Sequence, residues 1–130
     1  MIRSFAALAA VLAAALPGLA QPTAAQPETV MVTLRAKPGA EAELARVLER
    51  HWSTARAWNL VNDAPHLTLR GSDDGKVYFI EIFTWRDAAI PDSAPPAIQA
   101  IWAEMNRLVE PRGGKPGLDF TAVSLLAQAP

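Results

Sequence analysis

Apolar and polar residues alternate over residues 29–35, where Val30, Val32 and Leu34 share one side of the chain. A repeat of two predicts a β-strand with one buried face. After a short turn the apolar spacing changes to three and four residues, which predicts a helix that begins at Ala40. Its apolar stripe comprises Leu44, Val47, Leu48, His51, Trp52 and Ala55.

The next segment predicts a β-hairpin. Residues 62–65 have the composition of a loop, and residues 66–70 alternate again. The run GSDDG at residues 71–75 is a good hairpin turn. We therefore expect the strand at residues 76–85 to fold back antiparallel on the strand before it.

A second amphipathic helix follows the hairpin. Ser93 and the prolines at positions 95 and 96 favour a helix start, and the helix ends before Pro111. Residues 118–126 can form a fourth strand. The order strand, helix, strand, strand, helix, strand predicts an α+β, ferredoxin-like fold, a four-stranded antiparallel sheet with two helices on one face.

The strand at residues 76–85 is apolar on both of its faces. Tyr78, Ile80 and Ile82 lie on one face, and the other carries Val77, Phe79, Phe83 and Trp85. Two helices cover only one face of such a sheet, so the other face needs a different cover. A second copy of the same face would bury it, and we expect a symmetric homodimer that closes an α/β barrel.

Glu81 is the one carboxylate in the run YFIEIFTW at residues 78–85, and its neighbour depends on the hairpin register. A four-residue turn sets His66 opposite Glu81, and a His-Glu pair beside aromatic rings suits proton transfer. A three-residue turn with a bulge at Gly75 puts Glu81 into an apolar layer with Leu67 instead. The sequence leaves both registers open.

In an apolar layer the carboxylate of Glu81 needs a partner from a helix or from another subunit, because an unpaired buried charge is costly. An ion pair between subunits, with Arg35 or Arg70, is the structural alternative to a catalytic role. In either register, Glu81 does not belong to a solvated strand face.

The first twenty residues have the features of a secretory signal peptide. Arg3 precedes an apolar run at residues 5–16 that is too short to span a bilayer. We expect a cut after Ala20, or alternatively after Ala25, and a periplasmic or secreted protein; no cysteine stands at the cut to accept a lipid. We expect the rest of the chain to consist of a disordered tether at residues 21–28, one domain at residues 29–126 and a tail at residues 127–130.

Charge and motifs exclude several function classes. The formal charge of −1 becomes −2 without Arg3, and no basic block is present, which argues against nucleic acid and, after cleavage, against membranes as partners. Phosphate loops, nucleophile elbows and HExxH motifs are absent from the sequence. With two histidines and no cysteine, we expect no metal site.

The four tryptophans favour a binding site for a flat organic molecule. Trp102 lies on a helix stripe and is expected in the core, whereas Trp58 and Trp85 stand at element ends and are better candidates for a cleft. His51, on the stripe of the first helix, has either a structural role or a role in the cleft. His66 begins a polar strand face and is either exposed or part of the site.

Three segments together resemble the antibiotic biosynthesis monooxygenase-like branch of the dimeric α/β-barrel superfamily. They are the turn KPGAE at residues 37–41, the strand end EIFTWRD at residues 81–87 and the proline-led helix PPAIQAIW at residues 95–102. The resemblance covers residues 29–126 and implies a ferredoxin-like fold and a homodimer. It also implies activities found in that superfamily, which includes cofactor-free oxygenases of quinol-like or anthrone-like aromatic compounds and haem-degrading enzymes.

Few site residues of the family can be matched to positions in this sequence. Trp85 matches a tryptophan that often ends the third strand, and Asn59 or Asn62 would stand for an asparagine of the pocket. Haem-binding members carry a histidine between the third strand and the second helix, and residues 88–93 contain none. We therefore expect no haem and no other cofactor.

These observations give three hypotheses. The first is a cofactor-independent oxygenase of small aromatic compounds, with Glu81, His66 and Trp85 as catalytic residues. Its substrate-binding residues would be Trp58, Asn59, Asn62, Arg70 and His51. The second is a periplasmic binder of a small apolar or aromatic molecule, and the third is a dimeric structural or stress-related module.

Overall fold

The computed structural model describes Gly18 and residues 24–126. Apart from Gly18, the expected signal peptide at 1–20 lies outside the described residues, as does the tail at 127–130. Export therefore stays a prediction. No helix in the described part of the chain is long and apolar enough to cross a membrane.

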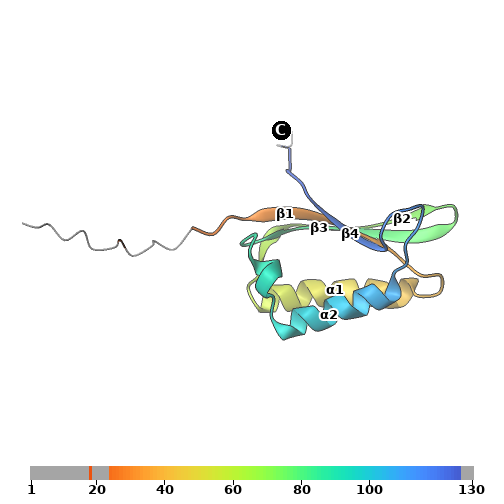
Figure 1. Ribbon diagram of the computed structural model, residues 1–130, viewed down its shortest axis with the longest axis horizontal. Helices are drawn as coiled ribbons and strands as arrows, with labels where there is room; N and C mark the ends of the chain where they lie inside the picture. The colour runs from red at the N-terminus through yellow and green to blue at the C-terminus, as the bar shows by residue number, and fades with distance from the viewer. Residues whose placement is uncertain (1–17, 19–23, 127–130) are drawn as a thin grey trace, which may run out of the picture.

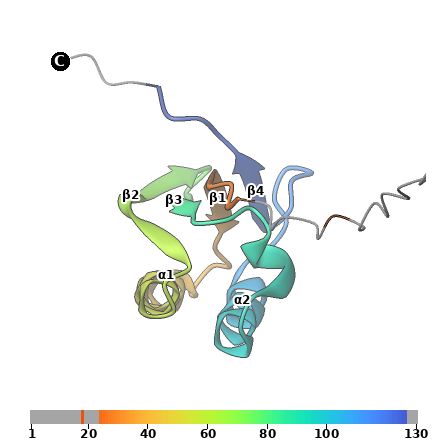
Figure 2. The ribbon, with the colours of Figure 1, turned by 90° about the vertical axis from the view of Figure 1, so that its left-hand side faces the viewer.

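The structure confirms the ferredoxin-like order of elements (Figure 1). Four strands form one sheet in the order β2-β3-β1-β4, and all of the neighbouring pairs are antiparallel. Both long helices lie on the same face of this sheet (Figure 2). The elements are β1 (Glu28–Arg35), α1 (Glu41–Ala57), β2 (Val61–Asp73), β3 (Lys76–Trp85), a 3-10 turn η1 (Ile90–Ser93), α2 (Pro96–Leu108) and β4 (Leu118–Ala122).

The hairpin between β2 and β3 is tighter than either register expected from the sequence. Asp73 pairs with Lys76, so only Asp74 and Gly75 form the turn. Both have positive φ angles, 50° and 74°, as a two-residue type I′ turn requires. Glu81 consequently pairs with Thr68. The predictions that placed it opposite His66 or Leu67 were both wrong.

β2 begins earlier than expected. Residues 62–65, predicted to be a loop, belong to this strand as an irregular stretch between Val61, which pairs with Trp85, and His66, which pairs with Phe83. An edge strand tolerates such an irregularity and a proline, because its outer side has no ladder to maintain. β4, the other edge, ends at Ala122 rather than at the expected residue 126.

The core between sheet and helices consists of two clusters of buried apolar residues. One cluster centres on Leu34, Leu44 and Phe79, and the other on Phe83 and Ile98. Val32 and Trp102 pack against both clusters. The buried polar residues Glu81 and His51 belong to neither cluster. Glu81 lies in the middle of β3 and His51 in the middle of α1, and the candidate site is located between them.

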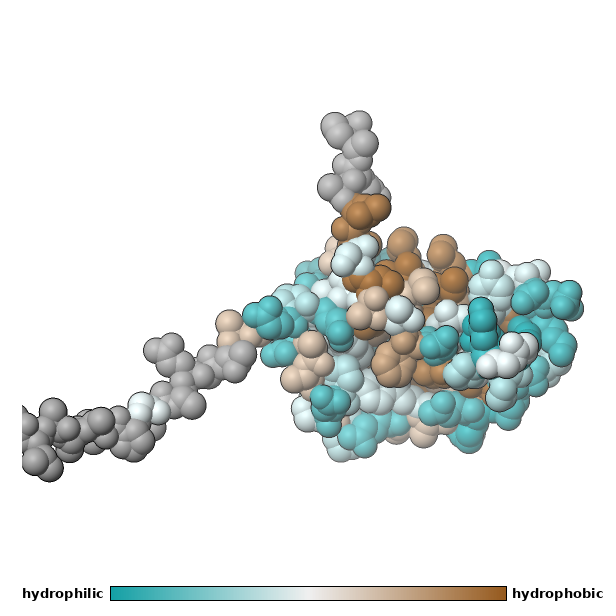
Figure 3. Space-filling view, turned by 45° about the horizontal axis from the view of Figure 1, so that its top comes forward, coloured by the Kyte–Doolittle hydropathy of each residue, from teal (hydrophilic) through white to brown (hydrophobic). Residues whose placement is uncertain are grey.

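No helix of the described residues lies on the opposite face of the sheet (Figure 2). Hydrophobic side chains gather on it (Figure 3), and on β2 the side chains of Leu67 and Leu69 are half exposed. Cross-strand pairing puts Ile82 beside Leu67 and Ile80 beside Leu69 on this face. We refer to the face formed by Met31, Leu67, Leu69, Tyr78, Ile80 and Ile82 as the outer face.

Candidate functional site

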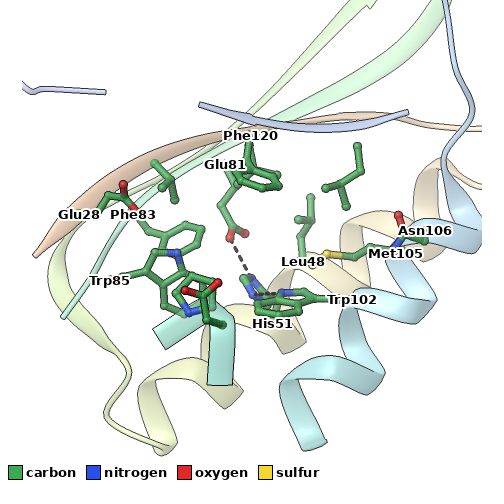
Figure 4. A pocket seen from close by; sticks show the side chains of 15 residues that line it. Glu28, Leu48, His51, Glu81, Phe83, Trp85, Trp102, Met105, Asn106 and Phe120 are labelled. Carbon is green, nitrogen blue, oxygen red and sulfur yellow. Dashed lines mark hydrogen bonds and ion pairs between the residues drawn. The ribbon is translucent and has the colours of Figure 1, made fainter. Parts of the chain in front are cut away.

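A cavity of about 390 Å³ lies between the sheet and the helices, a volume within the range of small-molecule sites. Figure 4 shows Glu81 entering it from the sheet and His51 from α1, with Trp85 on one side and Trp102 on the other. The lining is mostly apolar. It comprises Glu28, Val30, Val32, Leu48, His51, Glu81, Phe83, Trp85, Pro91, Asp92, Trp102, Met105, Asn106, Leu118 and Phe120.

Glu81 is the buried acid of this cavity, with 1% of its side chain exposed. It lies at the middle of β3 and pairs with Val32 on β1 and Thr68 on β2, so both sides of its backbone are held by the sheet. Its Oε1 lies 3.0 Å from Nδ1 of His51. A buried carboxylate without such a partner would be strongly disfavoured.

The hydrogen bonds around His51 determine its tautomer. The indole Nε1–H of Trp102 donates to Nε2 of His51 over 3.2 Å. Because an indole nitrogen only donates, Nε2 of His51 must present a lone pair, and the ring proton is on Nδ1. His51 therefore donates to Glu81, and the three side chains form a directed chain from Trp102 through His51 to Glu81 (Figure 4).

The second carboxylate oxygen of Glu81 lacks a hydrogen-bond donor among the described residues. Oε2 is buried and bonds to no residue in the described part of the chain. A buried acceptor without a partner costs free energy, and in native proteins such atoms often belong to functional sites. Glu81 lines the cavity, so a hydrogen-bond donor on a bound molecule would supply a partner for Oε2.

Aromatic rings form much of the wall around this oxygen. Phe83 and Trp85 meet edge to face at 4.9 Å between ring centroids, and Trp85 meets Trp102 in the same way at 6.2 Å. Phe120, on the edge strand β4, lines the cavity although 71% of its surface is exposed. A flat aromatic ligand would cover this exposed ring.

No protein-family model and no curated protein matches the chain. Solved structures match with TM-scores above 0.5. SnoaB, a cofactor-independent oxygenase from Streptomyces nogalater, is 18% identical with a TM-score of 0.58, and the match covers 82% of this chain and 99% of SnoaB. PA3566 from Pseudomonas aeruginosa is 19% identical with a TM-score of 0.58, over 82% of this chain and 100% of PA3566.

A protein of Caulobacter crescentus CB15, described as a candidate antibiotic biosynthesis monooxygenase, is 19% identical with a TM-score of 0.51. That match covers 76% of this chain and 91% of the Caulobacter protein. The chain has the fold of the antibiotic biosynthesis monooxygenase-like proteins. Identities below 20% show this shared fold and leave the reaction to be argued from the cavity itself.

Within this monooxygenase-like fold, three of the expected site residues meet at the cavity. Glu81, His51 and Trp85 all line it. Trp102, which was expected to be a core residue, also lines it and supplies the hydrogen bond to His51. Phe120 was not singled out from the sequence, because a single aromatic residue on an edge strand gives no periodic signal of its position.

His66 lies beside the site rather than in it. Its ring stacks on Trp52 with centroids 3.7 Å apart, and its Nε2 is buried without a partner among the described residues. Burial lowers the pKa of His66, the negative charge of Glu81 opposes this effect, and a charge on His51 would add to it. His66 does not line the cavity.

The remaining expected binding residues do not reach the cavity either. Trp58 is 54% exposed at the end of α1, and Arg70 lies over the ring of Phe79 at 5.9 Å. Asn59 and Asn62 are also outside the lining. In the described residues, no group of three or more His, Cys, Asp or Glu side chains is arranged to hold a metal ion.

Proposed function

We propose that this protein is a cofactor-independent oxygenase of small aromatic compounds with an acidic hydroxyl, such as quinols and naphthols. The observation that carries the proposal is Oε2 of Glu81, a buried carboxylate oxygen without a hydrogen-bond partner in the described part of the chain, on a residue that lines an aromatic cavity. The shared fold with SnoaB, a cofactor-independent oxygenase, supports the same reaction class.

The reaction begins with a proton transfer. Glu81 takes the phenolic proton of the bound molecule, and the electron-rich phenolate passes one electron to dioxygen. The resulting superoxide joins the ring at a carbon that carries hydrogen, and the peroxide loses water to leave a quinone. As the O–O bond and the ring C–H bond break, the leaving oxygen takes the phenolic proton back from Glu81 and the proton from the ring carbon, and departs as water. For a naphthol the balance is one substrate and one O₂ giving one naphthoquinone and one H₂O.

The residues around Glu81 each have a role in this proton transfer. His51 donates to Oε1 and so directs Oε2 at the bound molecule, while Trp102 keeps His51 in the donating tautomer. The rings of Trp85 and Phe120 hold the flat substrate and exclude water from it. A general base at hydrogen-bond distance from the transferred proton is worth about 10²–10⁴ in rate.

Oxygen uptake by the purified protein with a panel of naphthols and quinols tests the proposal. Glu81→Gln keeps the size of the side chain but removes the base, so we expect kcat to fall by about 100-fold or more. Glu49→Gln removes an exposed acid from α1 that does not line the cavity, and it should leave kcat unchanged.

Full oxygen uptake in Glu81→Gln would refute the role of Glu81. Binding of these compounds by calorimetry without oxygen uptake by the wild-type protein would refute the oxygenase and favour the alternative, a non-catalytic binder of a small aromatic molecule. The same apolar cavity would serve either function.

A further inference from the structure

The charged residues that line the cavity all have the same sign. Glu81 lies at its interior, and two more carboxylates belong to the lining, Glu28 at the start of β1 and Asp92 in η1. Neither lysine nor arginine is among the lining residues. A ligand in the cavity therefore meets three carboxylate side chains and no lysine or arginine side chain among the described lining residues.

The hydrogen-bond chain does not neutralise these acids. Trp102 donates to Nε2 of His51, so this histidine contacts Glu81 as a neutral donor and brings no positive charge. Oε2 of Glu81, on a side chain 1% exposed, has no partner in the described part of the chain. A ligand group that carries a hydrogen-bond donor or a positive charge would complete this arrangement, and a negative group would not.

We propose that the cavity selects aromatic ligands by charge, taking protonated aromatic amines at least as well as phenols and rejecting aromatic carboxylates. This inference rests on the proposed function, because it describes the substrate range of the same cavity. An ammonium group placed against Glu81 would also face the rings of Trp85 and Phe83, and aromatic faces attract cations.

A carboxylate ligand meets the opposite situation. It would bring a negative charge beside the buried Glu81, and like charges brought together in a binding site are strongly unfavourable. Glu28, which is partly buried, and Asp92, which is exposed, add a weaker repulsion at other parts of the lining, because solvent screens their charges.

Calorimetric titration of the purified protein with three ligands of one scaffold tests the inference: α-naphthylmethylamine, α-naphthol and α-naphthoic acid near pH 7. We expect the acid to bind at least about ten-fold more weakly than the amine, since tenfold is a modest effect for a like-charge contact. Equal affinity for acid and amine, or binding of none of the three, would overturn the inference.

Two sets of variants separate the local charges from the net charge of the protein. Glu28→Gln with Asp92→Asn should reduce the discrimination between acid and amine. Glu43→Gln with Glu49→Gln removes two exposed acids of α1 that do not line the cavity, and it should leave the discrimination unchanged. An equal effect of both pairs would overturn the assignment to the cavity.

The same ligands distinguish this inference from the proposed reaction. Rejection of the acid without oxygen uptake on the naphthol would leave charge selection standing and refute the oxygenase. Oxygen uptake on the naphthol with equal binding of acid and amine would support the oxygenase and refute charge selection.

Discussion

At the scale of single residues, the three hydrogen-bonded side chains of the site, Glu81, His51 and Trp102, stabilise one another. His51 is the central member, because it accepts from Trp102 and donates to Glu81 at the same time. An apolar replacement at this position would leave both neighbours without their bond. The free energy cost of a buried polar group that loses its partner exceeds the net gain of an ordinary hydrogen bond.

We expect His51→Leu to lower the free energy of unfolding by about 2–4 kcal/mol, because two buried groups would each lose a partner. Trp102→Phe keeps most of the ring and removes only the donor, so its cost should be smaller, about 1 kcal/mol. Urea unfolding of both variants measures the difference. Similar values for both would show that the chain through His51 does not act as a unit.

His66 should make the stability of the protein depend on pH. Burial lowers its pKa in the folded state below the ordinary value of 6.5, so between these two values the unfolded chain binds more protons than the folded one. Its contribution to stability is complete above pH 6.5 and is lost as the pH falls toward the folded pKa. Thermal unfolding from pH 7.5 to pH 5 should show a larger loss for the wild type than for His66→Phe, which keeps a ring against Trp52. Parallel curves for the two proteins would contradict this role.

At the scale of elements, the end of α1 explains an asparagine that the sequence suggested for the pocket. Asn59 has a φ of 57°. Its N–H donates to the carbonyl of Arg56, and the N–H of Leu60 donates to the carbonyl of Ala55. This pair of bonds is the Schellman arrangement, in which glycine or asparagine takes the left-handed position after a helix. Asn59 therefore terminates α1 outside the cavity.

We expect Asn59→Gly to keep both the thermal stability and the activity, because glycine adopts this φ without strain. Asn59→Val should lower the free energy of unfolding by about 1–2 kcal/mol, because a β-branched residue is strained there. Chemical unfolding and oxygen uptake measure the two effects. A loss of activity in a stable Asn59→Gly protein would show that the side chain of Asn59 contributes to the site.

The hairpin shows why element types were easier to predict than their register. The turn residues at 71–75 and the apolar run after them predicted β3 with its correct ends. The run GSDDG, in contrast, allows several turns of different length, and only the backbone shows that Asp74 and Gly75 take the two positive φ angles. Because one residue of slip moves every side chain to the other face, the neighbours of Glu81 could not be derived from the sequence.

The candidate site was predictable to the extent that its residues lie on strongly patterned elements. Glu81 stood out as an acid in an apolar strand, and His51 as a polar residue on a helix stripe. Their hydrogen bond joins α1 to β3, and such a contact depends on how the helix packs on the sheet. The role of Trp102 was missed for the same reason, because its stripe position predicts burial and not the direction of its N–H.

At the scale of the whole molecule, the two faces of the sheet differ in how they are covered. The helices cover one face, and the outer face keeps apolar side chains at its surface (Figure 3). Leu67 and Leu69 of this face are half exposed. Apolar area left in water favours association. A two-fold axis would set the outer face of one copy against that of another and bury Ile80 and Ile82 as well.

We therefore propose a homodimer through the outer face, and its strength should depend on Leu69. Leu69→Lys places an unpaired charge in the middle of the contact, and we expect the dissociation constant to rise by at least about ten-fold. Ser72→Lys is the matched control, since Ser72 is an exposed residue of the same strand whose side chain lies on the opposite face. Light scattering across a dilution series measures both variants. A wild-type monomer at all concentrations, or equal weakening by the two lysines, would contradict the outer face as the dimer contact. Weakening by Leu69→Lys alone would assign the contact to the outer face, because both variants add one lysine to β2 but on opposite faces of the sheet.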